Sequence, residues 1–199
     1  MSKSITLKEK YPPGDFAIWI IIYVELITFG LLFLGYVFSR RGDIELFNAS
    51  QLSLSQTSGF INTFILITSS YFVVKAVNSI KSMTQENYKE FNTQASKWLL
   101  LAIICGVAFL MIKITEFSHI FGEGINLSTN KFFMFYILLI GFHFMHVLLG
   151  SVILFNIYQK TKIYGYTPDD HRGFETGASY WHMVDLLWIV LFPLIYIIR

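Results

Sequence analysis

The sequence predicts an all-α protein, an integral membrane bundle of five transmembrane helices that forms a single domain. Hydrophobic residues make up 54% of the 199 positions and aromatic residues 18%. Charged residues make up only 14%, whereas a typical soluble domain carries about a quarter. Five apolar segments recur along the chain, each about as long as the roughly 20 residues that cross a bilayer as a helix. The formal charge of +2 gives no indication of nucleic-acid binding.

The five predicted helices lie near residues 16–38, 58–80, 98–121, 132–158 and 179–198. The connections between them, at 39–57, 81–97, 122–131 and 159–178, are too short to hold a separate domain. The first segment follows several lysines, as in a signal peptide, but its 23 residues exceed the 7–15 of a signal sequence and no small-residue cleavage site follows. We therefore expect it to be a retained membrane helix.

The orientation of the bundle follows from the Lys and Arg residues in its short loops, which favour the cytoplasmic side. The side that holds the N-terminus carries nine of them: Lys3, Lys8, Lys10, Lys81, Lys89, Lys97, Lys160, Lys162 and Arg172. The opposite side carries four: Arg40, Arg41, Lys131 and Arg199. This asymmetry predicts a cytoplasmic N-terminus and a C-terminus on the outer side.

Ionisable residues inside the apolar segments are the candidate functional residues, because an Asp in a membrane helix costs on the order of 2.5–3.5 kcal/mol. They are Glu25, Lys113, Glu116, His143, His146, His182 and Asp185. Lys113 and Glu116 are three apart and so share a helical face. We expect them to form an ion pair, with outward snorkelling of Lys113 as the alternative.

From their distances to the cytoplasmic ends of the helices, we predict that these residues lie in two layers. At 1.5 Å per residue, Glu25, Asp185 and His146 lie about 14, 9 and 18 Å from the cytoplasmic end and could meet in an inner layer. The Lys113–Glu116 pair, at about 24–28 Å, matches His143 at about 22 Å in an outer layer. We therefore expect a buried polar network in which proton handling is one role.

Haem or metal binding is not predicted. His143 and His146 lie one turn apart on one helix and cannot flank one iron, and His182 is about 13 Å shallower than His146. The lone Cys105 excludes a multi-cysteine metal cluster, and we interpret it as a small buried hydrophobe. The segment from Asp169 to Glu175 imitates a metal site, but we interpret it as solvated loop residues with a helix-capping Glu.

Two motifs resemble subunit III of the haem–copper oxidases. They are FHFMHVLLGSVIL at 142–154 and HRGFETGASYWHMVDLLWIVLFPLIY at 171–196. Glu25, in IIYVELITFGLLF, matches that family's helix with a buried glutamate followed by paired phenylalanines. The resemblance extends from about residue 13 to the end of the printed sequence.

The resemblance implies an accessory subunit without a catalytic site of its own. Haem and copper would lie in the catalytic subunit I, and this chain would pack beside it and other oxidase subunits in the bacterial plasma membrane. Assembly, lipid binding, proton uptake and turnover stability are the implied roles, and bound phospholipid is implied as well. By position, Glu25 would be the carboxylate of the polar network, and Trp181 and Trp188 would line lipid contacts.

Departures from the family pattern leave the catalytic partner open. Seven-helix members have two further N-terminal helices that are absent here, and the family's Gln-x-x-Glu-Tyr reads Lys113-Ile-Thr-Glu116-Phe117. TNKFFMFYILL and PGDFAIW are similar to the branch associated with nitric oxide reductase. The partner could thus be a cytochrome c oxidase, a quinol oxidase or a nitric oxide reductase, in aerobic or denitrifying electron transport. The alternative is a self-standing transporter or channel, although Pro193 is the only intramembrane proline that could break a helix.

Overall fold

The computed structural model describes residues 13–168 and 170–199. Lys3, Lys8 and Lys10 of the orientation argument, and Asp169 of the loop segment, lie outside this range. The described part contains α1 (Phe16–Gly42), α2 (Ile44–Gln51), α3 (Gln56–Lys81), α4 (Tyr88–Gly122), α5 (Lys131–Ile163), α6 (Arg172–Phe192) and the π-helical turn η1 (Pro193–Ile197).

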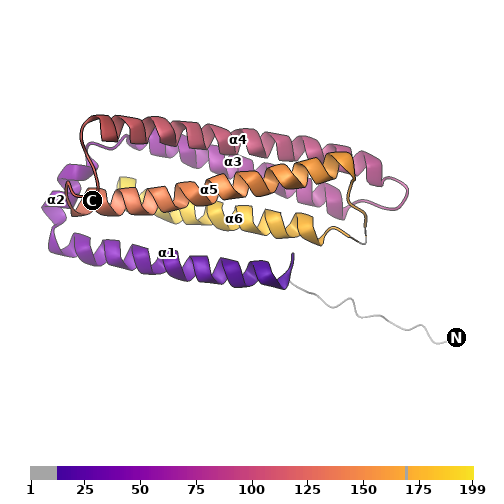
Figure 1. The fold of residues 1–199 in the computed structure, drawn as a ribbon, viewed down its shortest axis with the longest axis horizontal. Helices are drawn as coiled ribbons and strands as arrows, with labels where there is room; N and C mark the ends of the chain where they lie inside the picture. Colours follow the sequence, from indigo (N-terminus) through magenta and orange to yellow (C-terminus); the bar gives the residue numbers. More distant parts are fainter. Residues whose placement is uncertain (1–12, 169) are drawn as a thin grey trace.

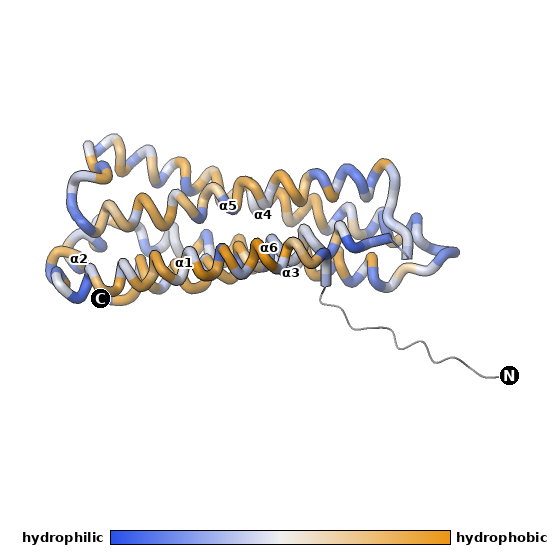
Figure 2. Tube along the Cα trace, turned by 60° about the horizontal axis from the view of Figure 1, so that its bottom comes forward, coloured by the Kyte–Doolittle hydropathy of each residue, from blue (hydrophilic) through white to orange (hydrophobic). Residues whose placement is uncertain are grey.

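The five long helices run side by side along one axis, and α1 lies at the edge of the bundle against α5 and α6 (Figure 1). All five are long and apolar enough to cross a membrane, with α6 and η1 forming the fifth span. Hydrophobic residues occupy the middle of the bundle and hydrophilic residues its two ends (Figure 2). The predicted class, an all-α multi-pass membrane bundle, is confirmed.

The helices extend beyond the apolar segments that predict them. α4 begins at Tyr88 rather than near residue 98, and α6 begins at Arg172 rather than near residue 179. Hydropathy marks where a helix enters lipid, whereas the backbone hydrogen bonds continue as long as the sequence tolerates helix. The polar first turns of α4 and α6 therefore lie in segments that the sequence pattern assigns to loops.

The helix α2 is absent from the prediction, which treats residues 39–57 as a connection. Its Phe47 is 1% exposed and packs edge-on against Tyr36 of α1 and Phe132 of α5, with ring centroids 5.4 and 5.7 Å away. With only eight residues, α2 is too short to give a membrane signal, and it is held by this aromatic contact.

The chain ends in a π-helical turn because Pro193 interrupts the α-helical pattern. The Ile198 N–H donates to the Pro193 carbonyl, 3.0 Å away. Two backbone carbonyls near this end accept hydrogen bonds from glutamine side chains. The Gln51 amide donates to the Ile195 carbonyl and the Gln56 amide donates to the Tyr196 carbonyl, each at 2.9 Å. These bonds fasten the end of the fifth span to α2 and α3, and Tyr196 points into the core with 0% exposure.

Candidate functional site

The predicted ion pair between Lys113 and Glu116 is confirmed. Their Nζ and Oε2 atoms are 2.8 Å apart, and the two side chains are 0% and 8% exposed. Lys113 therefore does not snorkel outward. The electrostatic attraction between the two charges is stronger here than in water, because a dry interior screens it less.

Two tyrosines complete the cluster around this pair. The Tyr136 hydroxyl donates to Glu116 Oε1 at 2.6 Å, and the Tyr196 hydroxyl donates to the same oxygen at 2.5 Å. Lys113 also donates to the Tyr196 oxygen at 2.8 Å, and its Nζ lies 4.7 Å from the centroid of the Trp188 ring. The buried charges are thus surrounded by hydrogen-bond partners and a π face.

The sequence prediction missed Tyr136 and Tyr196. Both occur in apolar runs, where tyrosine is ordinarily interpreted as packing or as an interfacial residue. A signal was available, since a buried ion pair needs further hydrogen-bond partners. Tyr136 and Tyr196 supply hydroxyls near the same outer end of the bundle.

His143, which the sequence assigns to the outer layer, is 0% exposed, and neither ring nitrogen has a hydrogen-bond partner among the described residues. Its ring packs against Phe109 and Trp188, with centroids 5.8 and 5.2 Å away. His143 therefore makes no hydrogen bond to the predicted ion pair, but the Trp188 ring contacts both His143 and Lys113.

Glu25 and His146 form a second polar pair, between α1 and α5. Glu25 Oε2 lies 3.1 Å from His146 Nε2, and 24% of the Glu25 side chain is exposed. His146 Nδ1 is 2.8 Å from the Phe142 carbonyl, which can only accept, so we assign the Nδ1 proton there. The contact between Nε2 and Oε2 then needs one proton, carried by either the imidazole or the carboxyl.

Asp185 does not join this pair, and the predicted inner layer is wrong in that respect. Asp185 lies next to Ser70 of α3, and His182 Nδ1 is 2.7 Å from the Ser70 hydroxyl. The spacing of three does place His182 and Asp185 on one face, but that face of α6 meets α3 rather than α1. Asp185 Oδ1 is buried and has no partner among the described residues.

Trp181 and Trp188 do not line a lipid-facing surface of this chain, which corrects the role implied by the resemblance. They are 1% and 0% exposed. The Trp188 Nε1 donates to Thr63 Oγ1 at 2.9 Å, and the Trp181 ring lies where Gly106 and Gly150 have no side chains. Since the two tryptophans are seven apart, they share the inward face of α6.

In the described part of the segment at 169–175, α6 begins at Arg172 and Glu175 forms an ion pair. Glu175 lies in the first turn of α6; its Oε1 is 2.9 Å from Lys81 Nζ, and its Oε2 accepts from the Gly14 N–H at 3.2 Å. It therefore connects α6 to α3 and to the start of α1 instead of capping its own helix. The described residues contain no group of three or more His, Cys, Asp or Glu side chains that could hold a metal.

These features define an all-helical multi-pass membrane protein. Each acid inside its spans lies next to a polar or basic side chain, which belongs either to the same helix or to a neighbouring one. A family model described as cytochrome c oxidase subunit III matches residues 33–199. The chain therefore belongs to this family, and the resemblance drawn from its motifs is confirmed.

Individual relatives support the same assignment. The chain is 32% identical over 139 residues to cytochrome c oxidase subunit 3 of Synechocystis, a match that covers 69% of this chain and 55% of that protein. It is 26% identical over 180 residues to a probable quinol oxidase subunit 3 of Staphylococcus saprophyticus, covering 90% of this chain and 86% of the relative. Identity to quinol oxidase subunit 3 of Bacillus subtilis is 28% over 185 residues, covering 90% and 84%. The chain thus spans about half the length of the first relative and most of the other two.

Proposed function

We propose that the chain is a non-catalytic accessory subunit that packs against the haem–copper subunit I of a bacterial respiratory oxidase. In this proposal it supports assembly, lipid binding, proton uptake and turnover stability, while haem and copper are held by the partner. Family membership and the oxidase names of the relatives support this placement. Those names cover cytochrome c and quinol oxidases; the nitric oxide reductase branch stays a prediction.

The observation that carries the proposal is the Glu25–His146 pair and its position. α1 is the least buried of the five spans, and its outward residues, such as Val24 and Ile27, are 55% and 64% exposed. Glu25 is partly open, and α1 carries no other charged residue before Arg40. A partner subunit covering α1 would therefore meet a carboxyl that exchanges one proton with His146, which is the chemistry that a proton-uptake role needs.

The orientation is part of the proposal. Among the described residues, the end of the bundle where α1 starts holds Lys81, Lys89, Lys97, Lys160, Lys162 and Arg172, and the other end holds Arg40, Arg41, Lys131 and Arg199. This excess supports a cytoplasmic start of α1 in the plasma membrane. The transporter alternative has no comparable support, because the spans in the described part are continuous except at η1, near the outer end.

Purification of the tagged full chain from its own host membrane, in mild detergent, tests the placement. We expect a haem-containing subunit to co-purify, with absorption bands of a haem–copper oxidase. A chain that purifies without any haem protein, under conditions that keep other respiratory complexes intact, would contradict the proposal.

Glu25→Gln tests the proton role in the same complex. The amide keeps the size and polarity but cannot exchange a proton with His146. We expect assembly and haem content to be unchanged, and the enzyme to complete fewer turnovers before it inactivates. Glu45→Gln, which removes an exposed acid from α2, is the control and should behave as the wild type. Equal turnover numbers for Glu25→Gln and the wild type would refute this role.

A further inference from the structure

A cavity of about 240 Å³ opens at the end of the bundle that holds Lys131, which is the predicted outer end. The connection between α2 and α3, the start of α3 and the last turns of α4 form its wall. The lining residues are Ser53, Leu54, Ser55, Ser58, Thr115, Glu116, His119 and Ile120, and Glu116 is the one acid among them. A passage from the surface thus reaches one member of the buried ion pair.

The carboxylate of the pair reaches this cavity, and the ammonium group does not. The Glu116 side chain is 8% exposed, whereas Lys113 is 0% exposed and does not line the cavity. Glu116 lies six residues before the end of α4 at Gly122, which is about 9 Å below that end at 1.5 Å per residue. Because the cavity spans this depth, the carboxylate can be reached from the aqueous phase.

The hydroxyl groups of the wall allow the cavity to hold water. Ser53 and Thr115 donate to backbone carbonyls of their own segments, at 2.6 and 2.8 Å. Ser55 accepts from the Ser58 N–H at 3.2 Å. Since a hydroxyl has one donor and two acceptor sites, each of these groups keeps capacity for a further hydrogen bond. The volume is several times the roughly 30 Å³ that one water molecule takes in the liquid.

The groups that face Glu116 determine what a proton on its carboxylate would do. From α4 they are Lys113 and His119, whose side chain is 71% exposed at the mouth of the cavity. From α5 and η1 they are the hydroxyls of Tyr136 and Tyr196. The residues that line the cavity from α3 and from the α2–α3 connection carry no ionisable group. Protonation of Glu116 would therefore leave the buried Lys113 ammonium without its counter-charge.

We infer that Glu116 exchanges its proton, through this cavity, with the aqueous phase at the Lys131 end of the bundle. Acidification of that phase neutralises Glu116, weakens the ion pair and loosens the end of the fifth span, which Tyr196 joins to the pair. This site is separate from the Glu25–His146 pair, which lies between α1 and α5. Because Lys131 defines the end concerned, the inference rests neither on the proposed function nor on the proposed orientation.

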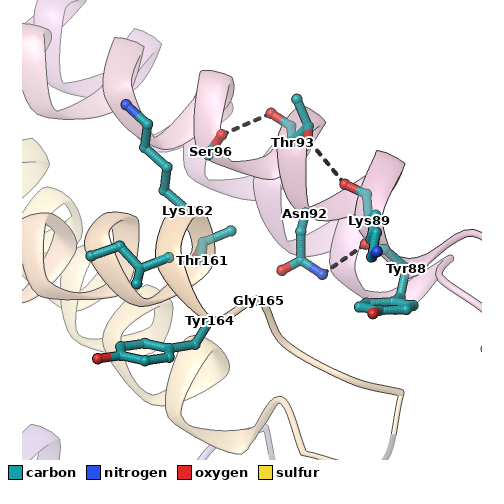
Figure 3. Close-up of a pocket in the computed structure, with 10 residues that line it drawn as sticks. Tyr88, Lys89, Asn92, Thr93, Ser96, Thr161, Lys162, Tyr164 and Gly165 are labelled. Atoms are coloured by element: carbon teal, nitrogen blue, oxygen red, sulfur yellow. Dashed lines mark hydrogen bonds between the residues drawn. The ribbon is translucent and has the colours of Figure 1, made fainter.

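A larger cavity, of about 410 Å³, lies at the opposite end of the bundle between α4 and α5, and none of its lining residues is an acid. Its two charged lining residues, Lys89 and Lys162, point apart (Figure 3). Its wall is held by Asn92, whose amide donates to the carbonyls of Tyr88 and Tyr166 at 2.7 and 2.8 Å. Filling this second cavity therefore controls for the general effect of a bulky side chain at a bundle end.

Carbodiimide labelling of the chain in its own host membrane tests the passage. A permanently charged, water-soluble carbodiimide, with taurine as the trapping amine, is added to spheroplasts or to inside-out vesicles, and the products are mapped by mass spectrometry. A cross-link from Glu116 to Lys113 is counted with the taurine adduct, since either amine can trap the activated carboxyl. We expect Glu116 to be labelled from the face at which an impermeant amine-reactive ester labels Lys131. Labelling from the face at which that ester labels the exposed Lys97, or from neither face, would overturn the inference.

Ser58→Trp, which fills the cavity without changing its charge, should abolish the labelling of Glu116. Ser118→Trp is the matched control, because Ser118 is an exposed residue at the same end of α4 that does not line the cavity. Thr93→Trp, which fills the cavity of Figure 3, is the second control. Both controls should be labelled as the wild type is. Undiminished labelling in Ser58→Trp would overturn the inference.

The pH dependence of unfolding tests the consequence for the bundle. A paired carboxylate contributes stability that is lost as the pH falls and the group is protonated. Acidification of the purified full chain from about pH 7 to about pH 4, a range in which carboxylates titrate, should therefore lower the unfolding midpoint of the wild type. The Lys113→Met/Glu116→Gln double variant has no charge at this site, and its midpoint should fall less. An equal fall in the two proteins would overturn the inference, whereas absence of a haem partner on purification would count against the proposed function alone.

Discussion

Lys113 and Glu116 form an ion pair inside a membrane bundle, one helical turn apart, with Nζ and Oε2 separated by 2.8 Å. Removing two charges from water is expensive, and the attraction between them compensates only when their remaining hydrogen-bonding capacity is satisfied. Tyr136 and Tyr196 supply that capacity from α5 and η1. The cluster therefore ties three separate elements together at one depth.

We expect Glu116→Gln to destabilise the chain by about 3–5 kcal/mol, because it leaves the Lys113 ammonium buried without a counter-charge. Unfolding by a denaturing detergent, followed by circular dichroism, measures the loss. The control is the Lys113→Met/Glu116→Gln double variant, which removes both charges and should recover part of the stability. A single variant as stable as the wild type would show that the pair does not hold the bundle.

Tyr196→Phe should destabilise the chain by about 1.5–3 kcal/mol, the usual range for a hydrogen bond to a charged group. The ring is kept, so only the hydroxyl that joins Glu116 to Lys113 is lost. Tyr164→Phe is the matched control, since Tyr164 is 82% exposed, and it should have no effect. The same unfolding assay applies, and equal midpoints for the two variants would contradict the assignment.

The sequence predicts the spans and the ion pair because both depend on local spacing. Length and hydropathy identify a membrane helix, and a separation of three places Lys113 and Glu116 on one face. The same reasoning cannot tell which neighbour that face meets. His182 and Asp185 do share a face, but it meets Ser70 of α3, a fact that depends on how α6 is rotated in the bundle.

Burial of the tryptophans could not be predicted for a related reason. Tryptophan is common at membrane interfaces, and a motif alone does not distinguish an interfacial ring from an internal one. The deciding feature is the absence of side chains at Gly106 and Gly150, on two other helices, where the Trp181 ring lies. Such complementarity between distant segments becomes visible only in the folded bundle.

Gly106→Ala tests this complementarity. A Cβ at this position would lie 2.8 Å from Cη2 of Trp181 and 3.0 Å from Ser151 Oγ, so we expect a loss of about 1–3 kcal/mol from overpacking. Combining it with Trp181→Phe should recover part of that loss, because the smaller ring leaves room for the methyl group. Gly141→Ala is the control, since nothing lies within 4 Å of its added Cβ; it should not destabilise the chain.

Asn92→Ala should release the connection between α5 and α6 while leaving the membrane spans folded. The amide of Asn92 makes three hydrogen bonds, two of them to the backbone of Tyr166. Burial raises the pKa of the Tyr166 phenol to about 12, with the nearby Asp170 carboxylate adding to the shift, so this ring stays neutral at physiological pH and packs against Phe174 with centroids 5.4 Å apart.

Hydrogen exchange of the Tyr166 amide is the direct measurement for Asn92→Ala. A lost hydrogen bond is worth about 1–3 kcal/mol when a buried group is left unpaired, so exchange should accelerate by roughly one to two powers of ten. Thr93→Ala is the control, because its exposed hydroxyl bonds only to the Lys89 carbonyl of its own helix, and it should leave the Tyr166 amide protected. Unchanged exchange in Asn92→Ala would mean that the ring packing, rather than the Asn92 amide, positions this connection and the wall of the adjoining cavity.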